Sequence, residues 1–320
     1  MPIDFNSIPG IRDKRIGLPR PDWVEVRDWL ATFTDQPEQN EAWNLFAEKW
    51  LAALIEALPD GYRVHESDGF YLLSQVDEAS SGRMLRWCES SQRKIDEFLP
   101  EIVFEEQGWK MIVLALSGRE LYCNYVADFY PEMGEFGMSG GMCMADLGHI
   151  VLCVIPNADL ERTIAHELVH GALAPLPLPL WLNEGVTQVL EDMIVDVSSF
   201  QMNSFIKNEH RAFWNEKTID EFWAGDSFYR PDDGQHLSYS LAQVLVLNII
   251  SGYGKKLNRF LIEAQKSDAG NAAAGAVFDV SLGERVAQFL GPGNWQPSGN
   301  YETMDAETEI GSDSSATSDT

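Results

Sequence analysis

Three side chains in the middle of the chain have the types and spacing of a metal site. His166 and His170 stand four positions apart in the run His-Glu-Leu-Val-His, and Glu184 follows fourteen positions later in Trp-Leu-Asn-Glu-Gly. Residues four apart lie on the same face of a helix, so two imidazoles at this spacing can bind one ion. A catalytic zinc takes three protein ligands and leaves a fourth position to water, and a carboxylate suits the third place. We therefore predict one Zn²⁺ held by His166, His170 and Glu184.

Glu167 supplies the other component of a hydrolytic site. Because it is adjacent to a ligand in sequence, its carboxylate is rotated away from the ligand stripe of a helix, yet it can still reach water beside the metal. Zinc lowers the pKa of a bound water to roughly 7, and a carboxylate base can transfer the proton to the leaving amine. This combination predicts a zinc hydrolase with Glu167 as general base. The alternative is a surface helix that carries these residues by chance, as in about 1% of chains of this length.

Two helices are expected to position these groups. Capping residues precede an apolar stripe at helical spacing over 160–172, which places the histidines in the middle of a helix. We expect Gly171 to end this helix, because a proline-rich connector follows it. A second helix is expected to begin near Trp181, with Glu184 in its first turn. Glu191 lies two turns further along the same face, where it either orients a ligand histidine or is a solvated surface residue.

The same residues carry a resemblance to a known family. The run HELVH followed by WLNEG resembles the gluzincin branch of zinc metallopeptidases, and residues 183–191 are similar to the ligand helix of aminopeptidase-N-like enzymes. The overall layout is closer to the small peptidase-MA-like domains, in which strands precede the zinc helix and a tyrosine-containing helix follows it. The resemblance implies that His166, His170 and Glu184 are zinc ligands and that Glu167 is the base.

Departures from the family pattern bear on the reaction. The connector between His170 and Glu184 holds thirteen residues and is shorter than in the aminopeptidases, and the segment 137–142 lacks the glutamate of a G-x-M-E-N motif. The carboxylate that would bind a free amino terminus is therefore not evident, which favours an endopeptidase over an aminopeptidase. A metzincin is excluded, since Leu173 and Leu176 stand where that pattern requires Gly and His.

A group that stabilises the oxyanion is expected from a later helix. The segment 235–242 offers an imidazole, His236, and a phenol, Tyr239, before an apolar helical run. Tyr239 resembles the tyrosine of the peptidase-MA-like pattern and could donate to the developing alkoxide, whereas packing within the helix is its other interpretation. His149 begins a β-branched run over 149–155 that predicts a strand at the border of the cleft, with an exposed edge for an extended peptide. The histidine itself is expected to be structural or to lie at the rim.

Composition restricts the class of protein. The 320 residues, 45% of them hydrophobic, suffice for a large core in one or two domains, and no stretch approaches the roughly 20 uninterrupted apolar residues of a membrane span. The net charge of −27 argues against nucleic-acid binding, which depends on clustered Lys and Arg. The first twenty residues carry charges and prolines where a secretory signal has an apolar run, so we expect a cytoplasmic protein. The four cysteines lack metal-binding or disulfide spacing and are expected to be reduced.

The expected fold class is α+β and zincin-like, with a small mixed sheet packed on the zinc helix and a mainly helical lobe after it. Residues 1–60 are expected to form an N-terminal helical extension, 61–292 the metallopeptidase domain, and 293–320 an acidic, Ser/Thr-rich disordered tail. The aromatic stripe of the extension either packs in the core, covers the cleft or binds a protein partner. Further elements are expected as strands over 70–73, 111–116 and 121–126 and as a helix over 78–99.

The function predicted from these residues is that of a zinc-dependent metallopeptidase acting on a peptide or protein substrate. A catalytically silent zincin-fold protein, which serves as a binding or interaction module, is the alternative. Retention of Glu167 beside all three predicted ligands favours the enzyme. A zinc-dependent amidase or ester hydrolase of non-peptide substrates also fits the motif.

Overall fold

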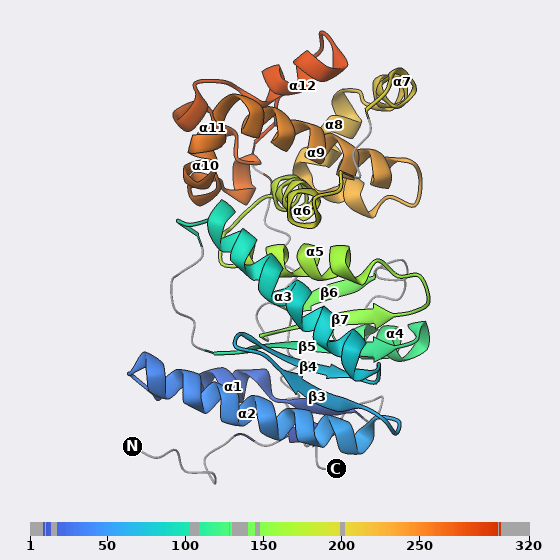
Figure 1. The fold of residues 1–320 in the computed structure, drawn as a ribbon. Coiled ribbons are helices and arrows are strands. Elements are labelled where there is room, and N and C mark those ends of the chain that lie inside the picture. Colours follow the sequence, from blue (N-terminus) through green and yellow to red (C-terminus); the bar gives the residue numbers. More distant parts are fainter. Residues whose placement is uncertain are drawn as a thin grey trace, which may run out of the picture.

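The described part of the chain is built as a stack of layers. The computed structural model describes residues 9, 11–13, 18–102, 109–127, 129, 140–144, 148–198, 202–299 and 301. Two N-terminal helices, a five-stranded sheet, two helices on the other face of the sheet and a helical lobe follow one another in space (Figure 1). The expected α+β class, with a small mixed sheet and a mainly helical second half, is confirmed.

The sheet is mixed and has the strand order β3-β4-β5-β7-β6. The three inner strands run parallel to one another, and an antiparallel strand closes each edge. Because both faces of the sheet are covered, the inner strands are continuous apolar runs. The strands are β3 (Arg63–Glu66), β4 (Phe70–Ser74), β5 (Met111–Ser117), β6 (Gly141–Met144) and β7 (His149–Val154).

The strand predicted over 149–155 is present as β7, but it does not form an edge of the sheet. β6 pairs with β7 and occupies the edge instead. The prediction that the His149 strand offers an exposed edge to a peptide is therefore wrong. Four residues rich in glycine and methionine gave no alternating pattern from which β6 could have been recognised.

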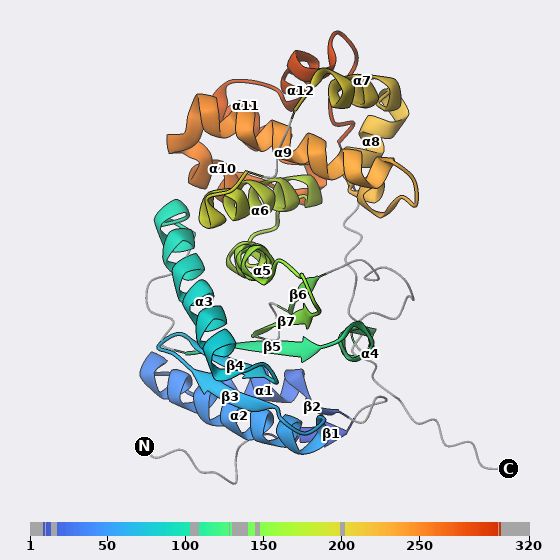
Figure 2. The same ribbon diagram turned by 45° about the vertical axis from the view of Figure 1, so that its right-hand side comes forward.

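Helices α1 (Trp23–Leu30) and α2 (Gln36–Ala57) cover one face of the sheet, beside a short ribbon of β1 (Ile11–Asp13) and β2 (Pro19–Pro21) (Figure 2). The aromatic stripe of α2 is fully buried there, in one hydrophobic cluster with side chains of the inner strands. Truncation of a buried tryptophan to alanine typically lowers the free energy of unfolding by about 3 to 5 kcal/mol. The stripe is therefore packed in the core.

Helix α4 (Arg119–Ala127) also packs on this face of the sheet, where a strand was predicted over 121–126. That prediction is wrong. Its buried side chains, Tyr122, Tyr125 and Val126, follow helical spacing, but a six-residue apolar run fits the period of a strand equally well.

Helices α3 (Glu78–Phe98) and α5 (Leu160–Leu173) cover the other face of the sheet. The side chain of Asp159 caps α5 by accepting from the backbone N–H of Arg162, which agrees with the predicted start of this helix. α5 runs through Gly171 to Leu173, so the prediction that the glycine ends the helix is wrong. A glycine stops a helix only when the chain turns left-handed there, and Gly171 keeps a helical conformation.

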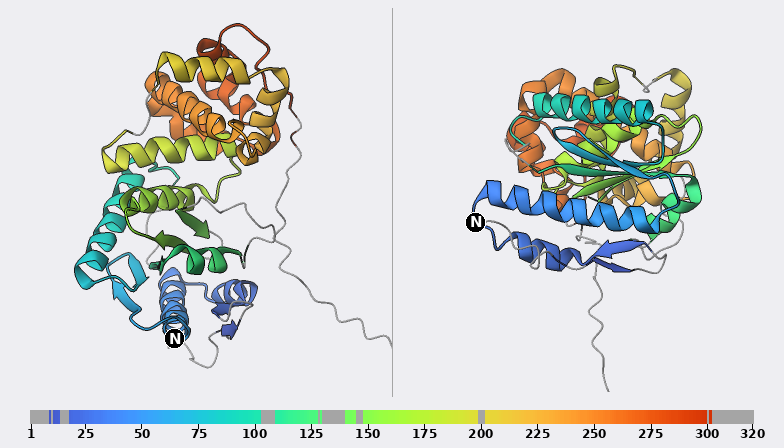
Figure 3. Two further views of the ribbon diagram at one scale, coloured as in Figure 1. Left: turned by 90° about the vertical axis from the view of Figure 1, so that its right-hand side faces the viewer. Right: turned by 60° about the horizontal axis from the view of Figure 1, so that its bottom comes forward.

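The helical lobe begins with α6 (Leu180–Val195), which lies between α5 and the central helix of the lobe, α9 (Gly234–Tyr253) (Figure 3). α6 and α9 cross closely at Gly185, where an added Cβ would come within 2.7 Å of the carbonyl oxygen of Ala242. This contact fixes α9 against the helix that carries Glu184. The other elements of the lobe are α7 (Ser204–Phe213), α8 (Glu216–Ala224), η3 (Asp226–Tyr229), η4 (Gly254–Lys256), α10 (Leu257–Glu263), η5 (Lys266–Asp268), α11 (Asn271–Phe278) and α12 (Leu282–Leu290).

One segment of the lobe, Gly234–Glu263, is long and apolar enough to cross a membrane by length and composition. Half of its most apolar window is buried inside the protein, and α9 within it packs against α6. Core helices of this kind pass the same test as membrane spans, and the absence of a span stays a prediction.

The end of the lobe lies beyond the boundary predicted at 293. The carbonyl oxygen of Trp295 accepts from the indole of Trp223 at 2.9 Å, and the hydroxyl of Tyr301 donates to Asp220 at 2.7 Å. Trp295 and Tyr301 thus bond to α8, and the boundary of the disordered tail stays a prediction. Residues 302–320 lie outside the described part of the chain.

Candidate metal centre

His166, His170 and Glu184 converge, each with one ligand atom within 4.8 Å of those of the other two. The Nε2 atoms of the two imidazoles are 3.0 Å apart, and Oε2 of Glu184 lies 3.7 Å from Nε2 of His170. Two turns of one helix, α5, supply the imidazoles, and α6 packs across it to bring in the carboxylate. The sequence predicted Glu184 in the first turn of this helix. Because α6 begins at Leu180, Glu184 lies in the second turn instead.

Hydrogen bonds at the Nδ1 atoms, on the side of each ring away from the other histidine, fix the orientation of both imidazoles. Nδ1 of His166 donates to Oε2 of Glu191 at 2.6 Å, and Nδ1 of His170 donates to Oδ1 of Asn183 at 2.8 Å. An imidazole that donates from Nδ1 directs its Nε2 to the opposite side of the ring, so the two Nε2 atoms face the same point. Glu191 is buried, and the interpretation as a solvated surface residue is wrong.

The histidines differ in their affinity for a proton. Burial disfavours the charged form of His166, but the hydrogen bond to Glu191 and the nearby carboxylates of Glu167 and Glu184 outweigh it and raise the pKa of His166 to about 9. Burial and the neighbouring charge of His166 lower the pKa of His170 to about 3. At neutral pH the pair therefore holds one proton, at the position where the two Nε2 atoms approach each other.

The residues present fit a zinc ion. Oε2 of Glu184 is buried, and no hydrogen-bond donor among the described residues reaches it. A buried carboxylate oxygen in this situation is costly unless a cation lies beside it, and burial raises the pKa of Glu184 accordingly. Two imidazole nitrogens and one carboxylate oxygen are the donor set of many catalytic zinc sites. The side chains of His166 and His170 remain 26% and 20% exposed, which leaves the centre accessible to solvent.

Glu167 lies next to this centre and is 6% exposed. Its carboxylate is held against the edge strand, where the backbone N–H of Cys143 donates to it. An added Cβ on Gly141 would come within 2.9 Å of Oε1, so a glycine at this position leaves room for the carboxylate. Burial raises the pKa of Glu167 to about 7, although the charge of His166 opposes the shift. Such a carboxylate can accept and release a proton near neutral pH.

Tyr239 and His236, both on α9, have different surroundings. Burial raises the pKa of Tyr239, and the charges of the carboxylates of Glu184 and Glu167 raise it further. Phe228 packs edge-on against the Tyr239 ring, with centroids 5.1 Å apart, and holds it in place. His236 is exposed, and its charge acts on His210 in the lobe. The charges of the site thus act on Tyr239, whereas His236 is exposed to solvent.

His149 belongs to the other face of the sheet. Its ring is 1% exposed, stacks on Trp23 with centroids 5.6 Å apart, and shares a hydrogen bond of 2.8 Å with the hydroxyl of Tyr125. Of the two predicted roles, rim and structural, the structure shows the structural one.

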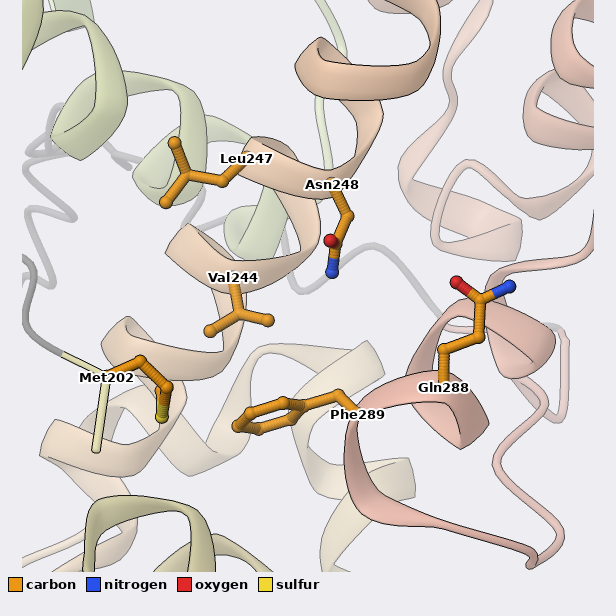
Figure 4. A pocket seen from close by; sticks show the side chains of 6 residues that line it. All are labelled: Met202, Val244, Leu247, Asn248, Gln288 and Phe289. Carbon is orange, nitrogen blue, oxygen red and sulfur yellow. The ribbon is translucent and has the colours of Figure 1, made fainter. Parts of the chain in front are cut away.

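Two pockets lie in the helical lobe. One has a volume of about 240 Å³ and lies between α9 and α12 (Figure 4), with a lining of Met202, Val244, Leu247, Asn248, Gln288 and Phe289. The other has a volume of about 740 Å³ and lies between α8 and the segment 294–301. Neither is lined by a residue of the metal centre, so the chemistry of the triad does not depend on them.

Sequence reasoning missed two residues that support the centre. Asn183, the partner of His170, stands directly before Glu184 in the sequence, and this adjacency was a usable signal. Arg162, which bonds to Glu191, stands one helical turn before His166, but only the packing of α6 on α5 reveals its partner. The four cysteines, all in the described part of the chain, form no disulfide.

The chain was also compared with known proteins. No model of a known protein family matches it, and no curated protein sequence does. What the site can do therefore has to be derived from its own residues.

Proposed function

We propose that the protein is a zinc-dependent metallopeptidase with a zincin-like fold, of the gluzincin type and peptidase-MA-like, that hydrolyses internal bonds of a peptide or protein substrate. The observation that carries this proposal is the convergence of two imidazole Nε2 atoms and an unsatisfied buried carboxylate oxygen, with Glu167 beside them. A structural zinc takes four protein ligands, which close its coordination, whereas a catalytic zinc takes three and leaves one position to water. The triad supplies three ligands, and the buried carboxylate of Glu167 lies next to it.

In the proposed reaction His166, His170 and Glu184 hold one Zn²⁺. When bound, zinc supplies a Lewis acid that polarises the scissile carbonyl and lowers the pKa of water. Glu167 accepts the proton of the attacking water and passes it to the leaving amine. Its burial against Gly141 keeps bulk water away from the carboxylate and limits its movement.

Tyr239 is the group proposed to stabilise the oxyanion. The charges of Glu184 and Glu167 act on its hydroxyl, and burial keeps the phenol protonated at neutral pH, so it can donate to a developing alkoxide. The close crossing of α6 and α9 at Gly185 holds Tyr239 at a fixed position relative to Glu184. No carboxylate of the G-x-M-E-N type occurs in the segment 137–142, of which 137–139 lie outside the described residues, and endopeptidase action is the better proposal.

We also propose that the protein acts in the cytoplasm and that its partners are peptides or proteins. A net charge of −27 disfavours nucleic acids and anionic membrane surfaces as partners.

The test is hydrolysis of a diverse peptide mixture by the purified protein, with and without a chelator. We expect cleavage at internal bonds, loss of cleavage with the chelator and recovery when Zn²⁺ is added back. Zinc bound without cleavage of any peptide, ester or amide would indicate a silent zincin-fold binding protein. A wild-type protein that binds no zinc would overturn the metal centre itself.

A further inference from the structure

Arg162 forms a charged cluster directly behind the candidate metal centre. Its Nη1 donates to Oε1 of Glu191 at 2.5 Å and to Oδ1 of Asp192 at 2.6 Å, and its Nη2 donates to the carbonyl oxygen of Val197 at 2.7 Å. The two carboxylates are adjacent in sequence at the end of α6, and their side chains are only 10% and 11% exposed. A single guanidinium from the start of α5 therefore joins the ends of the two helices that carry the metal ligands.

The two oxygens of the Glu191 carboxylate have separate partners. Oε1 accepts from Arg162, and Oε2 accepts from Nδ1 of His166 at 2.6 Å. Two poorly exposed carboxylates side by side repel each other, and without a shared cation Glu191 is driven away from Asp192 and toward solvent. That rotation would remove the acceptor that orients His166. The position of this imidazole thus depends on a residue that does not touch it.

A side chain of the helical lobe also forms a hydrogen bond with the cluster. Gln243 of α9 donates to Oδ2 of Asp192 at 3.1 Å, which leaves Oδ1 directed at Arg162. A guanidinium is suited to this place because its planar fork serves two carboxylates and a carbonyl in fixed directions. A lysine ammonium, a single point charge, serves fewer of them at once.

We propose that Arg162 is a positioning residue of the metal centre, which holds Glu191 in the orientation that fixes the ring of His166 for metal binding. This inference rests on the proposed function only in taking the triad as a zinc site. It assigns a role to a residue outside the motif, and it predicts that zinc affinity depends on the charge cluster.

The experiment is a zinc titration of Arg162→Met and Arg162→Lys in competition with a chromophoric chelator. Partners of metal-bound histidines typically contribute a factor of 10 to 100 in metal affinity, so we expect Arg162→Met to weaken zinc binding by about that factor. Arg162→Lys should recover part of the loss. The matched control is Arg230→Met, which removes an arginine that also bridges two carboxylates, Glu221 and Asp232, but away from the triad. Its zinc affinity should equal that of the wild type.

A double-mutant cycle separates positioning from general stability. If Arg162 acts through Glu191, then Arg162→Met in a Glu191→Ala background causes little further loss of zinc affinity, whereas independent effects would multiply. Thermal unfolding of each variant shows whether it is folded, and Arg162→Lys carries the test if Arg162→Met does not fold. Two results would overturn the inference and leave the zinc site intact. One is unchanged zinc affinity in the folded Arg162 variants, and the other is a double variant whose fold loss in zinc affinity equals the product of the two single losses. Absence of zinc from the wild type would instead remove the proposed function.

Discussion

The helices on the two faces of the central sheet pack around histidines, which have different surroundings on each face. On the face covered by α1 and α2, His149 is enclosed by Trp23, Trp50 and Tyr125, and its hydrogen bond runs to a phenol. On the face covered by α5, His166 and His170 are held by their Nδ1 atoms, and their Nε2 atoms point at each other beside Glu184.

This difference separates a structural from a chemical role. A structural histidine places its polar atoms against partners that suit a neutral ring, and its burial stabilises the fold. The pair on α5 instead brings together two nitrogens that cannot satisfy each other without a proton or a cation between them. Glu191 and Asn183 of α6 maintain that arrangement, and we propose that the unsatisfied pair is part of the function.

The largest expected effect comes from Glu167→Gln. The amide cannot accept the proton of the attacking water, so activity should fall by about 10²- to 10⁴-fold while zinc affinity stays near that of the wild type. Turnover of a cleaved peptide and zinc content are the measurements. Glu161→Gln, an exposed change on the same helix, is the matched control and should be active. Full activity of Glu167→Gln would exclude it as the base.

Tyr239→Phe should have the next largest effect. If the hydroxyl stabilises the oxyanion, kcat falls by about 10²- to 10³-fold with zinc content unchanged, because an oxyanion donor acts mainly in the transition state. His236→Ala, on the same helix but exposed, serves as the comparison and should retain kcat. A wild-type kcat for Tyr239→Phe would leave only the packing role against Phe228.

The shared proton of the histidine pair predicts the pH dependence of zinc binding. The pKa of His166 is about 9, so below this pH zinc must displace a proton from the pair. The apparent affinity should therefore rise with pH, by about tenfold per unit for one displaced proton, and level off as the pH passes the pKa of His166. Chelator competition at several pH values measures the slope. A flat profile between pH 6 and 8 would contradict the proposed proton sharing.

The smallest effect on chemistry is expected on the other face of the sheet. His149→Phe keeps a ring between the tryptophans but removes the hydrogen bond to Tyr125, which should lower the free energy of unfolding by about 1 to 3 kcal/mol. Zinc affinity and kcat should be unchanged. Denaturant unfolding measures the free energy of unfolding, and the assays above measure zinc affinity and kcat. A loss of zinc from this variant would contradict the structural role of His149.

Much of the site followed from the sequence because its spacing is local. The four-residue interval of His166 and His170 fixes a common helix face, and the capping residue Asp159 and the apolar stripe located that helix. Glu184 was predicted as their partner from the motif and the family resemblance, and the structure places it with them. Helix α3 was also located within one residue, because long amphipathic runs with capping residues are the strongest pattern.

The rest depended on contacts that no local pattern contains. The short apolar run at 121–126 fits a strand or a helix, and only its packing on the sheet decides for α4. The edge strand β6 exists because β7 offers it a partner. Arg162 finds Glu191 across twenty-nine positions of sequence, so its role becomes visible only when α6 lies on α5. Trp295 and Tyr301 belong to a segment of disorder-like composition, yet bonds to α8 order them.

The central claim is that two imidazoles of α5 and a carboxylate of α6 bind one ion. X-ray absorption spectroscopy at the zinc edge of the loaded protein tests it most directly. The account predicts a shell of nitrogen and oxygen atoms at roughly 2.0 to 2.2 Å, with the outer scattering of two imidazoles that is lost in part from His166→Ala. A sulfur shell at about 2.3 Å, or a spectrum with no imidazole signal, would contradict it.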